Sequence, residues 1–148
     1  MRFIYTAILL LSVQMLSAQQ FDSVLARKLG ADQFGMRHYV MAFLKPGTAA
    51  IKDSAQRNAL MQAHLKNIGR LSKEGKLAMA GPFLDGGNYA GVYIFNVATV
   101  ADAKALVETD PAVKAGVFSF EMHPWYGSAA LMQVVPIHNT IQKVSLTD

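Results

Sequence analysis

The chain has 148 residues, a formal net charge of +4 and no cysteine. This length suits one domain with a core of its own, and the lack of thiols excludes disulfides, thiolate metal sites and a lipid-anchored lipoprotein. Lysine and arginine are scattered without a basic run, which argues against a nucleic-acid partner.

The first 18 residues have the layout of a secretory signal peptide. Arg2 precedes a mostly apolar stretch from Phe3 to Leu16, and Ala18 is a small residue after which signal peptidase can cut. The stretch is shorter than the ~20 residues of a membrane span. We therefore predict a cleaved signal at residues 1–18 and a periplasmic or secreted protein with no stable membrane span after cleavage. An uncleaved anchor is the alternative.

A short helix and a strand are predicted next. Apolar residues recur at helical spacing between residues 21 and 34, with Asp22 or Ser23 as the cap and Gly30 at the end. This helix belongs to an N-terminal extension, residues 19–36. The segment Tyr39–Leu44 is almost continuously apolar, which predicts a strand covered on both faces.

A long helix is predicted from about Asp53 to Glu74. Asp53 can accept from the first backbone amides while Gln56 reaches back, the pattern of a capping box, and Gly75 follows as a left-handed residue. Apolar residues spaced three and four apart mark one stripe that faces the core. His64 lies on this stripe, among Met61, Leu65, Ile68 and Leu71.

Two strands follow, joined by a glycine-rich turn. The first covers Leu77–Ala80 and is ended by Gly81-Pro82, and the second runs from Tyr89 to Val97. Asp85 opens the turn between them. Alternation places five residues of the second strand on one face: Tyr89, Gly91, Tyr93, Phe95 and Val97.

A second helix is predicted from Thr99 to just before Asp110-Pro111, because the residue before a proline resists the helical region. Alternation from Val117 to Trp125 predicts the fourth strand. The resulting order, βαββαβ, predicts an α+β fold of the ferredoxin-like type, a sandwich with a four-stranded antiparallel sheet.

Both helices of such a fold cover one side of the sheet and leave its other side bare. Bulky residues on a bare face need a cover, and a second copy of the same sheet is the simplest one. We therefore expect a homodimer. The apolar C-terminal extension, residues 128–148, is expected to reach across it.

His64 and Asp85 are the candidate catalytic residues, because an imidazole held by a carboxylate makes a proton-transfer pair near neutral pH. In a βαββαβ unit, the end of the strand before Asp85 can approach the middle of the preceding helix. The structural alternatives are a hydrogen-bonded core histidine and an ordinary turn aspartate.

Several apolar or aromatic side chains are candidates to line a pocket near this pair, although core packing also explains most of them. They are Met41, Phe43, Met61, Phe83, Tyr93, Phe120 and Trp125. Trp125 and Tyr126 are amphipathic aromatics that suit a pocket rim or a dimer seam. His38, His64, His123 and Asp85 show no diagnostic ligand spacing, so neither a metal nor a cofactor is predicted.

Several motifs in this order resemble the YCII-related family, over roughly residues 38 to 126. They are His64-Leu65, Gly75-Lys76-Leu77 leading to Ala80-Gly81-Pro82-Phe83, Asp85-Gly86-Gly87, the third strand, and Asp110-Pro111 through Val117 leading to His123-Pro124-Trp125. The resemblance implies a dimeric α/β barrel of ferredoxin-like subunits and an active-site pair at His64 and Asp85. It also implies a fold related to those of muconolactone isomerase and small cofactor-free oxygenases. Some members of the family act on chlorinated aromatic breakdown products.

The sequence therefore predicts a YCII-like α/β domain at residues 37–127, flanked by the two extensions. The leading functional hypothesis is a cofactor-independent enzyme of the lyase, isomerase or dehalogenase kind. His64 would act as acid or base on a small cyclic or aromatic compound, and Asp85 would orient it. The alternative is a non-catalytic dimer that binds a small molecule or serves only as a structural module.

Overall fold

The computed structural model describes residues 20–146 of the chain. The predicted signal peptide, residues 1–18, lies outside this part. Within it, no helix is long and apolar enough to cross a membrane.

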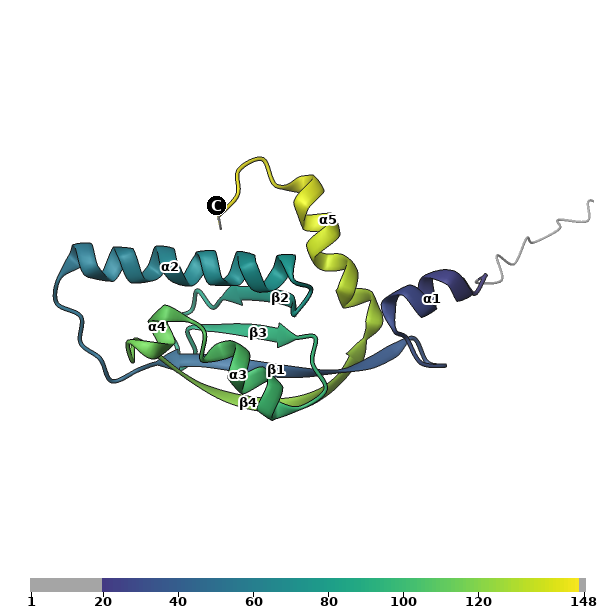
Figure 1. Ribbon diagram of the computed structural model, residues 1–148, viewed down its shortest axis with the longest axis horizontal. Coiled ribbons are helices and arrows are strands. Elements are labelled where there is room, and N and C mark those ends of the chain that lie inside the picture. Colours follow the sequence, from purple (N-terminus) through teal and green to yellow (C-terminus); the bar gives the residue numbers. More distant parts are fainter. Residues whose placement is uncertain (1–19, 147–148) are drawn as a thin grey trace, which may run out of the picture.

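A four-stranded antiparallel sheet forms the centre of the fold (Figure 1), in the order β2-β3-β1-β4. Its strands are β1 (Met36–Pro46), β2 (Leu77–Pro82), β3 (Gly91–Phe95) and β4 (Phe118–Ser128). The central strand β1 pairs with β4 along its whole length, from Met36 opposite Ser128 to Pro46 opposite Phe118. This strand order is that of a ferredoxin-like fold, and it confirms the predicted α+β class.

Three helices connect the strands: α2 (Ser54–Lys73), α3 (Val100–Val107) and α4 (Pro111–Lys114). The carboxylate of Asp53 accepts hydrogen bonds from the N–H groups of Ala55 and Gln56, at 2.7 and 3.0 Å, and so caps α2 as predicted. Just beyond the other end of α2, Gly75 has a φ of +67°, a conformation that costs glycine little.

Side chains on the two faces of the sheet have different surroundings. On the helix side, a core cluster joins alternate residues of β1 and β3 to α2 and α3: Val40, Ala42, Leu44, Leu71, Leu77, Tyr93, Phe95, Ala103 and Val107. On the other side, Tyr39, Ala78 and Ile94 form a smaller cluster, against which Trp125, Leu131 and Met132 pack. Tyr39 and Val40 are adjacent and both fully buried, so the start of β1 is covered on both faces, as its apolarity predicts.

The ends of all four strands differ from the predicted ones, and two differences concern individual residues. β2 continues through Gly81 and Pro82 instead of ending at Ala80, because an edge strand tolerates a proline that offers no N–H to a further neighbour. Tyr89 does not share the face of Tyr93. It precedes β3, and its ring lies 5.1 Å from that of Phe43, on the side of the sheet away from the helices.

The N-terminal extension contains helix α1 (Ser23–Leu29), which Asp22 caps and which ends at Gly30, as predicted. The guanidinium of Arg37 joins this helix to the sheet. It donates to the carbonyl oxygen of Leu29 at 2.6 Å and to the side-chain oxygen of Asn96 at 2.5 Å.

The C-terminal extension forms a 3-10 helix, η1 (Ala129–Gln133), and then helix α5 (Val134–Ile141). Figure 1 shows the chain turning back after β4 and running through α5 on the same side of the sheet as α2. In this structure the extension packs against β2 of its own chain, a different placement from the expected reach across a second copy.

Candidate functional site

His64 meets a carboxylate on the buried side of α2, and that carboxylate belongs to Asp110. The two side chains are 10% and 0% exposed, and 2.7 Å separates Nδ1 of His64 from Oδ2 of Asp110. Asp110 is also the N-cap of α4, since its Oδ1 accepts from the N–H of Ala112 at 2.8 Å. One carboxylate therefore starts a helix and holds the histidine ring.

Asp110 is the ionised partner of this pair. Burial raises the pKa of Asp110, but the hydrogen bond and charge of His64, together with the N–H groups of Ala112 and Val113, outweigh burial and lower the pKa below its ordinary value of 3.8. An ionised carboxylate only accepts hydrogen bonds, so Nδ1 of His64 must donate to it. In the neutral ring, Nε2 is then left as a proton acceptor.

Asn67, one turn along α2 from His64, supports the same carboxylate. Arg70 donates to the side-chain oxygen of Asn67 at 2.8 Å, and this contact orients the amide so that its nitrogen lies 3.5 Å from Oδ2 of Asp110. Arg70 also donates to the hydroxyl of Thr109 at 2.9 Å. Asn67 and Arg70, three residues apart on α2, thus hold the loop that carries Asp110.

Tyr93 of β3 completes the group. Its hydroxyl lies 3.4 Å from Nε2 of His64 and 3.5 Å from Oδ2 of Asp110, and the rings of Tyr93 and His64 are stacked at an interplanar angle of 22°. Burial raises the pKa of Tyr93, and the negative charge and hydrogen bond of Asp110 raise it further. The hydroxyl therefore keeps its proton, which it donates to Oδ2 of Asp110.

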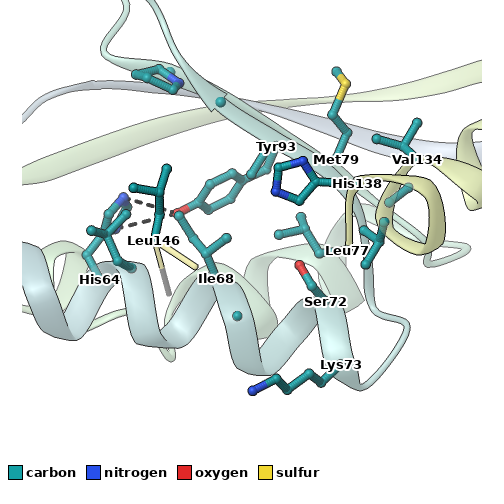
Figure 2. Close-up of a pocket in the computed structure, with 18 of the residues that line it drawn as sticks. His64, Ile68, Ser72, Lys73, Leu77, Met79, Tyr93, Val134, His138 and Leu146 are labelled. Atoms are coloured by element: carbon teal, nitrogen blue, oxygen red, sulfur yellow. Dashed lines mark hydrogen bonds between the residues drawn. The ribbon is translucent and has the colours of Figure 1, made fainter. Parts of the chain in front are cut away.

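His64 and Tyr93 line a cavity of about 760 Å³ (Figure 2). Its walls come from α2, from β2 and from the chain after η1, with Ile68, Met79 and Val134 as examples from each. The imidazole and the phenol hydroxyl are thus polar groups in the wall of a largely apolar space, the usual character of a small-molecule site.

The expected pairing of His64 with Asp85 is not found. Asp85 lies in the exposed loop between β2 and β3, where its Oδ1 accepts from the N–H of Gly87 at 3.1 Å. This contact is typical of an ordinary turn aspartate, the structural alternative for Asp85. Asp110, which the sequence analysis treated only as the residue that stops a helix, occupies the place expected for Asp85.

Of the seven residues proposed for a pocket near the pair, the structure brings two, Met61 and Tyr93, into the cavity with His64. Phe83 lies in the loop after β2 and is 41% exposed. Phe120 packs against the helix-side core. The other three, Met41, Phe43 and Trp125, lie on the opposite face of the sheet, because alternation along β1 and β4 turns them away from α2.

Two signals in the sequence point to the missed residues. An aspartate followed by a proline also fits the N-cap and first position of a new helix, which is what Asp110 and Pro111 form. His64 and Asn67 are three residues apart and therefore share one face of α2. No local signal connects either residue to Asp110, which lies beyond two strands and a helix.

The candidate metal ligands do not converge. Across residues 20–146, no three His, Cys, Asp or Glu side chains come together as a metal ion would require. His38 instead packs against the ring of Tyr126, 5.2 Å away, and His123 lies near Glu121 with its Nε2 3.5 Å from Oε1. Tyr126, proposed for a rim or seam, donates its hydroxyl to Asp32.

Comparison with known proteins gives one family and a related structure. No curated protein matches the chain. A solved structure of 5-chloro-2-hydroxyhydroquinone dehydrochlorinase (TftG) from Burkholderia phenoliruptrix AC1100, in complex with 2,5-dihydroxybenzoquinone, is similar at 23% identity and a TM-score of 0.44. The match covers 58% of this chain and 92% of that one. The model of the YCII-related domain matches residues 36–125, more than half of the chain, which therefore belongs to the YCII-related domain family.

Proposed function

We propose that this protein is a cofactor-independent enzyme of the lyase, isomerase or dehalogenase kind, acting on a small cyclic or aromatic compound. The observation that carries the proposal is the 2.7 Å contact between His64 Nδ1 and Asp110 Oδ2 at the wall of an apolar cavity. We assign to Asp110 the orienting role that the sequence analysis gave to Asp85.

The pair supplies acid–base chemistry without a metal or cofactor. With Nδ1 bound to Asp110, Nε2 of His64 takes a proton from a carbon or hydroxyl of the substrate, and the charge of Asp110 stabilises the imidazolium that forms. The electron pair left on the substrate expels a leaving group, which is elimination, or it is protonated again at another atom by Nε2, which is isomerisation. The hydroxyl of Tyr93 donates to Asp110 in the free protein and would turn to a substrate oxygen that gains negative charge.

Turnover tests this proposal directly. We expect a screen of cyclic carbonyl compounds and halophenols to yield a substrate, and we expect His64→Ala to lower its kcat/KM by about 100-fold or more, the usual contribution of a general acid–base group. His38→Ala is the matched control, because His38 is exposed and does not line the cavity. Equal turnover by the native protein and His64→Ala would remove His64 from the mechanism.

A structural role for the pair is the alternative, favoured by the cap that Asp110 provides to α4. In this reading the cavity binds a molecule without changing it, or His64 only stabilises the fold. Native mass spectrometry of the purified protein would reveal a retained ligand. A ligand that is bound but never converted, with no substrate found in the screen, supports the binding module.

We also propose that residues 1–18 direct export, so that the protein is periplasmic or secreted. The support is the order of Arg2, the apolar stretch and the small residue Ala18. A protein recovered from outside the cytoplasm should begin at Gln19, which N-terminal sequencing would show. Recovery with Met1 intact would favour the uncleaved anchor.

Finally, we propose a homodimer in which a second sheet covers the face away from α2, as in a dimeric α/β barrel. The support is the apolar and aromatic character of that face, where Met41, Phe43 and Trp125 lie. The connecting helices α2, α3 and α4 pack against the other face of the sheet, where they share one core.

A further inference from the structure

One wall of the cavity comes from outside the family domain. The family match ends at residue 125, whereas the chain after η1 contributes residues to the cavity from Val134 as far along as Leu146. Figure 2 shows Val134 and Leu146 at this wall, with Leu146 on the side of His64 and Val134 on the side of Leu77 and Met79. The C-terminal segment, residues 134–146, therefore shapes the space that a substrate of His64 would enter.

The lining is mostly apolar and contains no acidic residue. At one end, His64 and Tyr93 offer an acceptor nitrogen and a donor hydroxyl. From there, Ile68, Leu77 and Met79 continue an apolar surface along α2 and β2. Lys73 also belongs to the lining, but in Figure 2 its ammonium group points away from the cavity. Polar side chains of the C-terminal segment, His138 among them, also reach this wall, but apolar lining predominates. This arrangement suits a ligand with one polar end and an uncharged, mostly apolar remainder.

The size of the cavity supports an elongated ligand. Its volume of about 760 Å³ lies in the upper part of the ~300–1,000 Å³ range that holds drug-sized molecules. A single-ring compound at His64 would leave the part between β2 and α5 unfilled. An apolar chain of several carbons attached to that ring would fill it and displace water from its walls.

We infer that the site binds an elongated, uncharged molecule whose hydroxyl- or carbonyl-bearing ring meets His64 and whose apolar chain lies between α2, β2 and the C-terminal segment. The position of the ring rests on the proposed function, because it assumes that His64 is the reacting group. The role of the C-terminal segment as a specificity element does not depend on catalysis.

A series of 4-alkylphenols tests the inference by binding alone, measured by calorimetry on the full chain. Affinity should rise about fourfold for each methylene added between 4-ethylphenol and 4-hexylphenol, the gain expected from burying a methylene group. Phenol itself should bind most weakly. An affinity that stays flat across the series would overturn the inference.

Two pairs of variants test the C-terminal segment, and the first pair is matched in exposure. Leu146→Asp places a charge at the cavity wall, and Val144→Asp places it at a residue with the same 76% exposure that does not line the cavity. We expect Leu146→Asp to weaken 4-hexylphenol binding about fivefold or more, because an apolar chain would lie against a charge, and Val144→Asp to change it less than about twofold. Val134→Asp should likewise weaken the binding of 4-hexylphenol, and Ile137→Asp, at a residue that does not line the cavity, should change it little. Equal effects within both pairs would overturn the assignment of this wall.

The same measurements separate this inference from the proposed function. His64→Ala keeps the apolar walls, so the gain per methylene should persist in it even if all turnover is lost. A native protein that binds 4-hexylphenol through the C-terminal segment but converts no compound would remove the proposed enzyme and leave this inference standing. Turnover that needs His64 but shows no preference for the length of the alkyl chain would support the proposed function and overturn this inference.

Discussion

At the scale of single residues, Asp110 couples the chemistry of the site to the stability of the fold. Its carboxylate is fully buried, where it accepts a hydrogen bond from His64 and caps α4. Because its pKa in the folded protein lies below the ordinary value, the ionised form stabilises the native state. That stabilisation is fully present above the ordinary pKa and is lost as the pH falls through the lowered one.

We therefore predict that Asp110→Asn lowers the free energy of unfolding by about 2 kcal/mol at neutral pH, the usual value of a hydrogen bond to a charged group. The difference from the native protein should shrink as the pH falls below about 4, because the unfolded chain takes up a proton there first and Asp110 of the native protein follows at its lowered pKa. Urea unfolding at a series of pH values measures this. A difference that stays constant down to acid pH would contradict it.

The control at this scale is Asp85→Asn. It also removes one carboxylate, but from an exposed loop position where an asparagine oxygen can keep the turn contact with Gly87. The free energy of unfolding should change by less than about 0.5 kcal/mol. Loss of stability on the scale of Asp110→Asn would mean that Asp85 has a role that the loop geometry does not show.

At the scale of elements, α2 carries both His64 and Asn67, so its start and end determine how firmly the site is held. Asp53→Ala removes the side chain that accepts from the N–H groups of Ala55 and Gln56. We predict a loss of about 1 kcal/mol in the free energy of unfolding, the typical value of an N-cap. Urea unfolding should show most of it restored in Asp53→Asn, because asparagine caps nearly as well. An unchanged Asp53→Ala variant would show that packing alone fixes this end of α2.

The elements could be predicted from sequence because their signals are local. The cap at Asp53, the left-handed Gly75 and the apolar stripe of α2 all lie within or beside the helix that they define. The partner of His64 could not be predicted in this way, because β2, β3 and α3 separate it from Asp110. Asp85 was expected because the strand before it ends near α2 and because the family resemblance implies this pair, whereas the structure pairs His64 with Asp110. A contact of this kind depends on how α4 packs against α2, which no local pattern encodes.

At the scale of the whole molecule, the sheet order follows from the βαββαβ pattern, but the place of the C-terminal segment does not. Its apolar residues indicate that it must be covered, and both a second copy and the cavity of its own chain satisfy that requirement. In the structure, Val134 and Val135 face the cavity, while Ile137 and Ile141 are 56% and 73% exposed. The apolar residues predicted that the segment is covered and left the covering surface undetermined.

The proposed dimer gives the last prediction. Phe43 lies on the sheet face away from α2, with its ring 5.1 Å from Tyr89 and 6.0 Å from His123. A second sheet on this face would bury Phe43, and Phe43→Lys would then leave an ammonium group without water at the interface, which costs several kcal/mol unless it is paired. Analytical ultracentrifugation should therefore find the native chain as a dimer and Phe43→Lys as a monomer. Phe34→Lys, at a 74% exposed position in the loop before β1, should remain a dimer. A native monomer, or a Phe43→Lys dimer as stable as the native one, would show that this face of the sheet is not the interface.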